Sequence, residues 1–145
     1  MKNEMELKFS SMSTNESFAR AVVAAFVAQL DPTLEELSDI KTAVSEAVTN
    51  AVIHGYEEKD GIIYIRVGLS DDTADIEIED YGKGIADIKQ AMEPFYTSKP
   101  DMERSGMGFS FMEAFMDELH IESTPDSGTK IKMRKVIGKN CGSNA

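Results

Sequence analysis

Hydrophobic and polar residues alternate at the start of the chain and then recur at helical spacing. Residues 5–10 read Met-Glu-Leu-Lys-Phe-Ser, an alternation that is typical of a half-buried strand. From Phe18 to Leu30, apolar residues recur at intervals of three and four, which predicts an amphipathic helix. The pair Asp31-Pro32 ends this helix, because proline cannot extend a helix and disfavours helical backbone at the residue before it.

A second, longer helix is predicted from Thr33 to about His54. Thr33 and Glu36 have the spacing of a capping box, and Gly55 is a natural stop. At 1.5 Å per residue this helix would be about 30 Å long, so we expect it to lie across a sheet. Its apolar stripe consists of Leu37, Ile40, Val44, Ala47, Val48 and Ala51.

Two β-rich runs follow, at residues 62–69 and 73–80, on either side of Asp71-Asp72. A polar pair between such runs predicts a hairpin. In the second run isoleucines alternate with glutamates, so one face is apolar and the other polar. This alternation favours an antiparallel sheet with one solvated face.

The second half of the chain begins with a segment, residues 81–108, that is interrupted by glycine and proline around a short possible helix at 85–92. A helix at 109–119 and strands at 120–123 and 129–136 are predicted after it. The helices are grouped and the strands come in hairpins, so we expect an α+β fold with a mixed or antiparallel sheet under the helices. We expect one domain over residues 1–137, a lid at about 94–107 and a disordered tail at 138–145.

The composition narrows the possible partners. The 145 residues carry a net charge of −11, which repels nucleic acid and anionic membranes, so neither is expected as a partner. The single cysteine, Cys141, excludes a disulfide framework and fits a reducing cytoplasm. No apolar run approaches 18 residues, and the N-terminus lacks the apolar region of a signal peptide. We therefore expect a cytoplasmic protein.

Glu46 and Asn50 are the first candidate for chemistry. They are four residues apart near the end of the long helix, so their side chains project together. A carboxylate and an amide oxygen side by side suit a proton acceptor and a ligand for a hard metal ion. Such pairs are usually the solvated side of an amphipathic helix, and the two residues alone do not decide between these interpretations.

Three glycine-containing segments provide the other candidates. Asp80-Tyr81-Gly82-Lys83-Gly84 follows a strand, where the Asp can accept a hydrogen bond from an exocyclic amine and so select adenine. Ser105-Gly106-Met107-Gly108 opens a helix, an arrangement that favours a phosphate. Gly128-Thr129 starts the last strand. Each segment alone also fits an ordinary turn or helix cap, and neither a Walker motif nor a G-x-G-x-x-G motif is present.

The order and spacing of these motifs resemble the ATP-binding domains shared by gyrase and the histidine kinases, over residues 33–135. The resemblance implies a two-layer α/β sandwich of the Bergerat type, with ATP and Mg²⁺ between helices and a mobile lid. It further implies that Asn50 holds Mg²⁺, Asp80 binds the adenine amino group, Gly82 and Gly84 shape the pocket, Gly106 and Gly108 contact phosphates, and Thr129 supports the adenine site.

Longer blocks at residues 15–20, 45–56 and 97–109 resemble the anti-sigma serine kinases of sporulating bacilli, with the stress-response anti-sigma kinases as close relatives. This likeness spans nearly the whole chain. It implies that the protein holds an RNA polymerase sigma factor of the sigma-F type, and that it uses ATP to phosphorylate a serine of an anti-anti-sigma protein. Paired with ADP it would bind the anti-anti-sigma protein, and with ATP it would hold sigma. Members of this kind act as homodimers, for which the strand at 5–10 and the first helix are candidates.

Serine phosphorylation needs a proton acceptor and charge neutralisation, which assigns roles to further residues. Glu46 is the candidate base, and a single Asn50 suffices for Mg²⁺, which completes its shell with phosphates and water. Arg104 would clamp the γ-phosphate or contact a partner, and Arg20 is a candidate partner contact; ordinary solvated arginines are the alternative for both. The predicted nucleotide contacts in the lid region are Thr97, Lys99, Ser105, Gly106, Met107 and Gly108.

Two other functions are compatible with the same motifs. In an ATPase of the gyrase type the glutamate would activate water, with no protein acceptor. In a non-catalytic module nucleotide binding would control partner binding without turnover.

Overall fold

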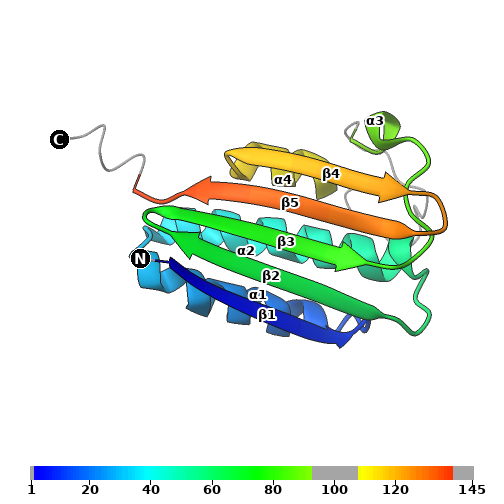
Figure 1. Cartoon of the computed structure of the whole chain (residues 1–145), viewed down its shortest axis with the longest axis horizontal. Coiled ribbons are helices and arrows are strands. Elements are labelled where there is room, and N and C mark those ends of the chain that lie inside the picture. The colour runs from blue at the N-terminus through cyan, green and yellow to red at the C-terminus, as the bar shows by residue number, and fades with distance from the viewer. Residues whose placement is uncertain (1, 93–107, 139–145) are drawn as a thin grey trace.

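The computed structural model describes residues 2–92 and 108–138 as two layers, one sheet and one set of helices (Figure 1). The chain order is β, α, α, β, β, α, α, β, β, with β1 (Lys2–Ser10), β2 (Ile62–Ser70), β3 (Thr73–Asp80), β4 (Glu118–Thr124) and β5 (Gly128–Val136) as the strands. The predicted α+β class and the two-layer sandwich are confirmed. Of the two sheet types expected, the antiparallel one is observed, in the strand order β1-β2-β3-β5-β4.

Three helices, α1 (Asn15–Val27), α2 (Leu34–Asn50) and α4 (Gly108–Phe115), cover one face of the sheet, and no described helix covers the other face (Figure 1). A 3-10 turn, Ala28–Leu30, follows α1. The short helix α3 (Ile88–Ala91) is a single turn near the end of the sheet where β4 leads into β5 (Figure 1). The side chains between the two layers are almost entirely aliphatic, which provides the hydrophobic stabilisation of the fold.

The predicted capping box is present at the start of α2. The Thr33 hydroxyl accepts the backbone N–H of Glu36 at 3.1 Å, and Glu36 accepts the Thr33 N–H at 2.8 Å. The second carboxylate oxygen of Glu36 accepts the N–H of Gly138 at 2.9 Å. One buried carboxylate therefore joins the start of α2 to the chain that follows β5.

Several predicted boundaries differ from the structure, and three of the differences concern helices in or near the candidate motifs. The helix expected at 109–119 ends at Phe115, and Glu118 and Leu119 belong to β4, where they pair with Arg134 and Met133. Sheet pairing outweighs helical periodicity here, since helix propensity is a weak prior. The short helix expected at 85–92 is confined to 88–91.

The third difference is the end of the long helix. The α-helix stops at Asn50, and residues Ala51–Gly55 form one π-helical turn. Helical structure still ends at the predicted Gly55.

Among the described residues, no helix has both the length and the apolar character needed to cross a membrane.

Candidate functional site

Three buried polar side chains lie at the same end of the apolar core. On β3 the residues facing the helices are Ala74, Ile76, Ile78 and then Asp80, which is only 3% exposed. Thr129 starts the matching row on β5, is 4% exposed and pairs with Asp80 across the two strands. Asn50, the last residue of α2, is 9% exposed. An acid, a hydroxyl and an amide thus occupy positions where the core pattern calls for apolar residues.

Burial raises the pKa of the Asp80 carboxyl from 3.8 to about 6, although backbone N–H groups of Gly82 and Thr129 donate hydrogen bonds that oppose this shift. The Gly82 N–H lies 2.9 Å from Oδ1. A buried carboxylate favours a ligand that supplies hydrogen-bond donors. The exocyclic amine of a purine is such a donor, so the environment fits the role expected for Asp80.

Glycines allow the backbone to close around this carboxylate. A Cβ placed on Gly82 would lie 2.0 Å from the carbonyl oxygen of Gly55, so any larger residue would separate the two segments. The N–H of Lys83 donates to the same carbonyl at 2.9 Å. Gly84 has a φ of +76°, a left-handed conformation that glycine adopts without steric cost. Both glycines predicted to shape the pocket therefore stand where glycine is required.

The π-helical turn brings Gly55 next to the Asp80 carboxylate. The N–H of Tyr56 bonds to the carbonyl of Ala51 at 2.9 Å, five residues back instead of four. The extra residue rotates the following chain by about 100° relative to a continuous α-helix. Gly55 then stands so close to the Asp80 carboxylate that a Cβ on it would lie 2.8 Å from Oδ1. Sequence reasoning identified Gly55 only as a helix stop.

Glu46 lies one helical turn before Asn50, so the two side chains share a side of α2 as expected. Glu46 is partly buried. Among the described residues, no group of three or more His, Cys, Asp or Glu side chains is arranged to hold a metal ion. A metal at this end would take Asn50 as its protein ligand and complete its shell from elsewhere. That donor set suits Mg²⁺, which retains waters and binds nucleotide phosphates.

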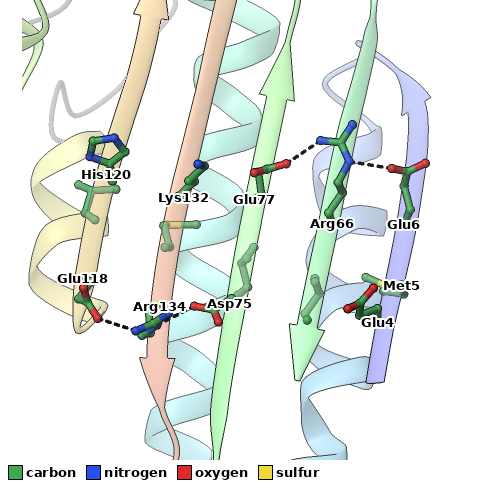
Figure 2. Close-up of a pocket in the computed structure, with 15 residues that line it drawn as sticks. Glu4, Met5, Glu6, Arg66, Asp75, Glu77, Glu118, His120, Lys132 and Arg134 are labelled. Carbon is green, nitrogen blue, oxygen red and sulfur yellow. Dashed lines mark hydrogen bonds and ion pairs between the residues drawn. The ribbon is translucent and has the colours of Figure 1, made fainter. Parts of the chain in front are cut away.

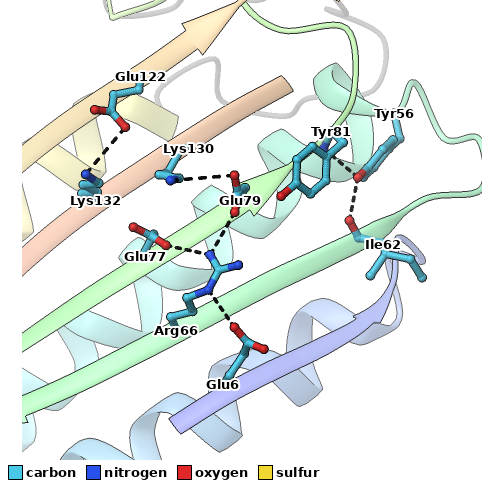
Figure 3. Close-up of polar contacts among 10 residues, drawn as sticks. All are labelled: Glu6, Tyr56, Ile62, Arg66, Glu77, Glu79, Tyr81, Glu122, Lys130 and Lys132. Carbon is cyan, nitrogen blue, oxygen red and sulfur yellow. Dashed lines mark hydrogen bonds and ion pairs between the residues drawn. The ribbon is translucent and has the colours of Figure 1, made fainter. Parts of the chain in front are cut away.

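Two hydroxyls that sequence reasoning missed lie beside the predicted residues. The Ser123 hydroxyl is 2.8 Å from that of Thr129 and accepts the N–H of Ile85 at 2.7 Å. The Tyr56 hydroxyl accepts the N–H of Tyr81, the residue after Asp80, at 2.8 Å (Figure 3). The only signal for either in the sequence is proximity to a motif, since serine and tyrosine are common in strands and turns.

The other predicted contacts are divided between described and undescribed residues. Gly108 begins α4, as predicted. The guanidinium of Arg20 lies 3.2 Å from the Ser17 hydroxyl, 3.5 Å from the Ser45 hydroxyl and 3.6 Å from the Glu16 carboxylate. It is therefore anchored on α1 beside the residue that precedes Glu46. The predicted site residues that lie outside the described residues are Thr97, Lys99, Arg104, Ser105, Gly106 and Met107.

The open face of the sheet carries a hollow that is separate from this site (Figure 2). Gly68 forms part of its floor, and its rim holds alternating acids and bases. Arg66 bonds to Glu6 and Glu77, each at 2.7 Å, and Arg134 bonds to Asp75 at 2.7 Å. These charges compensate one another across strands, so the hollow has the character of a solvated sheet surface.

Comparison with known proteins agrees with this geometry. Residues 9–135 match the family described as histidine kinase-like ATPase domain. The chain is 62% identical over 138 residues to an anti-sigma F factor of Caldanaerobacter subterraneus subsp. tengcongensis, with 95% of this chain and 96% of that protein covered. It is 57% identical over 140 residues to the anti-sigma F factor of Bacillus subtilis, with 96% of each covered.

A solved structure shares the fold. The blue-light activated histidine kinase of Erythrobacter litoralis EL346 superposes with a TM-score of 0.58 at 17% identity. The match covers 83% of this chain and 42% of that one, so the common part is one domain of a longer protein. The near full-length identity to anti-sigma F factors is the more specific result. The chain therefore belongs to the anti-sigma F factors, within the family of histidine kinase-like ATPase domains.

Proposed function

We propose that this protein holds a sigma-F-type RNA polymerase sigma factor inactive and phosphorylates a serine of its anti-anti-sigma antagonist, using ATP and Mg²⁺ in the cytoplasm of a sporulating cell. The observation that carries the proposal is the buried Asp80 carboxylate, enclosed by Gly55 and Gly82 and paired with Thr129 across the sheet. The names of the close relatives supply the sigma factor as partner.

The adenine end of the nucleotide would lie against Asp80 and Thr129. Asp80 accepts a hydrogen bond from the exocyclic amine, and the Thr129 hydroxyl supports the same edge of the base. Gly82 and Gly84 form the backbone wall of the pocket. The structural support is burial: a carboxyl that is costly to bury is retained at the end of an otherwise aliphatic row.

The phosphate end would lie toward α2 and the start of α4. When bound, Mg²⁺ neutralises charge on the phosphates, with Asn50 as its protein ligand. Glu46, one turn earlier, accepts the proton of the attacking serine hydroxyl. The phosphates are held by Gly106 and Gly108 together with the neighbouring Thr97, Lys99, Ser105 and Met107. Arg104 binds the γ-phosphate or a partner.

The nucleotide would also select the partner. With ATP the protein holds the sigma factor, and with ADP it pairs with the anti-anti-sigma protein. Arg20 is the proposed partner contact, since its guanidinium lies on the polar side of α1 near Ser45 and hence close to the Glu46 turn of α2. Two copies would pair through β1, an edge strand, and α1. Nucleic acid and membrane are not proposed as partners.

Two assays separate this function from its alternatives. The sigma factor is captured with immobilised protein in ATP or ADP, and labelled ATP is incubated with the protein and the anti-anti-sigma protein. Phosphoserine on that partner, with ATP-dependent sigma capture, supports the proposal. Free phosphate without a labelled partner would indicate an ATPase, and nucleotide-dependent capture without turnover would indicate a binding module.

A further inference from the structure

The segment that carries Asp80 into α3 is held at its beginning by the hydroxyl of Tyr56. That hydroxyl accepts the Tyr81 N–H at 2.8 Å and donates to the carbonyl of Ile62 at 2.6 Å (Figure 3). The Tyr56 hydroxyl therefore uses its proton in one hydrogen bond and a lone pair of its oxygen in the other. The residue after Asp80 is thereby tied to Ile62 at the start of β2, the strand that pairs with β3.

The position of the Tyr56 ring is itself restricted. A Cβ on Gly61 would come within 2.5 Å of two of its ring carbons, so the ring packs directly on the backbone before β2. Burial raises the pKa of the Tyr56 hydroxyl above its usual value of 10, partly opposed by the hydrogen bond from Tyr81, so the group stays protonated and able to donate at neutral pH. The hydroxyl is thus positioned by two hydrogen bonds and by the packing of its ring on the backbone at Gly61.

The far end of the same segment is held by Ser123 of β4. Its hydroxyl accepts the Ile85 N–H at 2.7 Å and lies 3.0 Å from the carbonyl of Gly128 and 2.8 Å from the hydroxyl of Thr129. A serine hydroxyl has one proton and two lone pairs, all of which these contacts can use. Ser123 therefore connects the end of the Asp80 segment to the residue that faces Asp80 across the sheet.

We propose that Tyr56 and Ser123 are positioning residues, and that their hydroxyls make the site selective for adenine. They hold residues 81–85 at both ends, so that the Asp80 carboxylate has one position and one direction. This inference rests on the proposed function of Asp80 as the group that binds the adenine amine.

The physical reason concerns discrimination more than affinity. Guanine presents an oxygen where adenine presents an amine, and an oxygen facing a fixed carboxylate leaves two acceptors opposed. A carboxylate that can move away relieves this opposition and tolerates either base. Loss of either hydroxyl is therefore expected to lower selectivity even in a folded protein.

The test compares the dissociation constants of ATP and GTP by calorimetry in the presence of Mg²⁺. The variants of the full-length chain are Tyr56→Phe, Ser123→Ala and the double variant. Each single variant should lower the ratio of the GTP to the ATP dissociation constant about five- to tenfold, the effect of one lost hydrogen bond. Ser123→Thr keeps a hydroxyl and should restore most of the selectivity lost in Ser123→Ala.

Two matched controls separate positioning from general loss of a hydroxyl. Tyr64→Phe alters a tyrosine whose ring meets the Tyr81 ring edge to face at 5.7 Å, and Ser70→Ala alters an exposed serine at the other end of β2. Both should leave the ratio unchanged. Amide hydrogen exchange gives a second measurement, in which the Tyr81 N–H should exchange faster in Tyr56→Phe and the Ile85 N–H in Ser123→Ala.

The outcomes distinguish this inference from the function on which it rests. If Asp80→Asn loses the preference for ATP while Tyr56→Phe and Ser123→Ala keep it, the positioning role is wrong and the role of Asp80 stands. If Asp80→Asn keeps the preference, the proposed role of Asp80 fails, and with it this inference. A lower melting temperature with an unchanged ratio would show that both hydroxyls are merely structural.

Discussion

Gly55 and Asp80 are in direct contact, so that a Cβ on the glycine would lie 2.8 Å from Oδ1 of the carboxylate. The glycine is in a helical turn, where alanine is conformationally acceptable, so the constraint comes from the contact and not from the backbone. The nearest atoms belong to a short side chain at the end of β3. A larger residue at position 55 must therefore displace the carboxylate.

Gly55→Ala should weaken ATP binding at least about tenfold, since the Asp80 carboxylate moves from the position that receives the adenine amine. Calorimetric titration with ATP measures the change. Gly68→Ala is the matched control, because nothing lies within 4 Å of a Cβ at that glycine in β2. Equal affinities in wild type and Gly55→Ala would show that the Gly55–Asp80 contact does not shape the site.

Asp80→Asn should increase stability at neutral pH while weakening adenine nucleotide binding. Folding raises the pKa of Asp80 from 3.8 to about 6, so the folded state binds its proton more tightly than the unfolded state does. That contribution is fully present below about pH 4 and is lost as the pH rises through 6. Removing the charge should add about 1–3 kcal/mol to the free energy of unfolding at pH 8, and little at pH 4.

Urea denaturation of Asp80→Asn and wild type across pH 4–8 tests this prediction, with calorimetric titration of ATP as the functional measurement. An equal difference in stability at every pH would contradict the titration of Asp80. Unaltered ATP affinity in Asp80→Asn would contradict its role in base recognition.

The same titration predicts a pH dependence of nucleotide binding in the wild type. Below about pH 6 the Asp80 carboxyl is protonated in the free protein, and one of its oxygens becomes a donor. ATP affinity should then fall as the pH is lowered from 7 to 5, more steeply than in Asp80→Asn. Parallel pH profiles for the two proteins would assign the dependence to another group.

Glu46→Gln should retain ATP binding and lose phosphotransfer by about a hundredfold or more, because the amide cannot accept the serine proton. Labelled transfer to the anti-anti-sigma protein measures the rate, and calorimetry confirms nucleotide binding. Glu35→Gln, at an exposed position in the first turn of the same helix, is the control. An unchanged transfer rate would remove Glu46 from the mechanism.

Glu36→Ala should destabilise the fold by about 1–3 kcal/mol, since it removes acceptors for the backbone N–H groups of Thr33 and Gly138. Burial by itself would raise the pKa of Glu36, but these hydrogen bonds and Lys135 outweigh it and lower the pKa below 4.5. The stabilisation is therefore present above the unfolded pKa and lost as the pH falls through the folded one. Urea denaturation from pH 7 to 3, with the exposed Glu35→Ala as control, checks both statements.

Much of the fold followed from local patterns. The alternation in β3 predicted its two faces, and the Thr33–Glu36 spacing predicted a capping box that is present. The boundary between α4 and β4 was misplaced because Glu118 and Leu119 continue an apolar helical pattern, and only their pairing with β5 assigns them to a strand. Local periodicity contains no information about strand partners.

For the site, the sequence predicted that the Asp80 motif stands at the end of a strand, and the structure places Asp80 on the apolar face of that strand. Thr129 occupies the equivalent position on β5. By contrast, no pattern in the sequence indicated the π-helical turn, the packing of Gly55 on Asp80, or the contacts of the Tyr56 and Ser123 hydroxyls. These depend on how α2, β2 and β4 approach the end of β3.

Local patterns along the chain predicted most of the elements, the faces of β3, the acidic character and the candidate polar residues, because periodicity and residue chemistry are local properties. Tertiary structure alone decided that Asn50, Asp80 and Thr129 are buried at one end of the core, since that depends on contacts between residues far apart in the chain. It also decided the pKa of Asp80. A carboxyl loses its water only when Gly55, Gly82 and the neighbouring strand close around it.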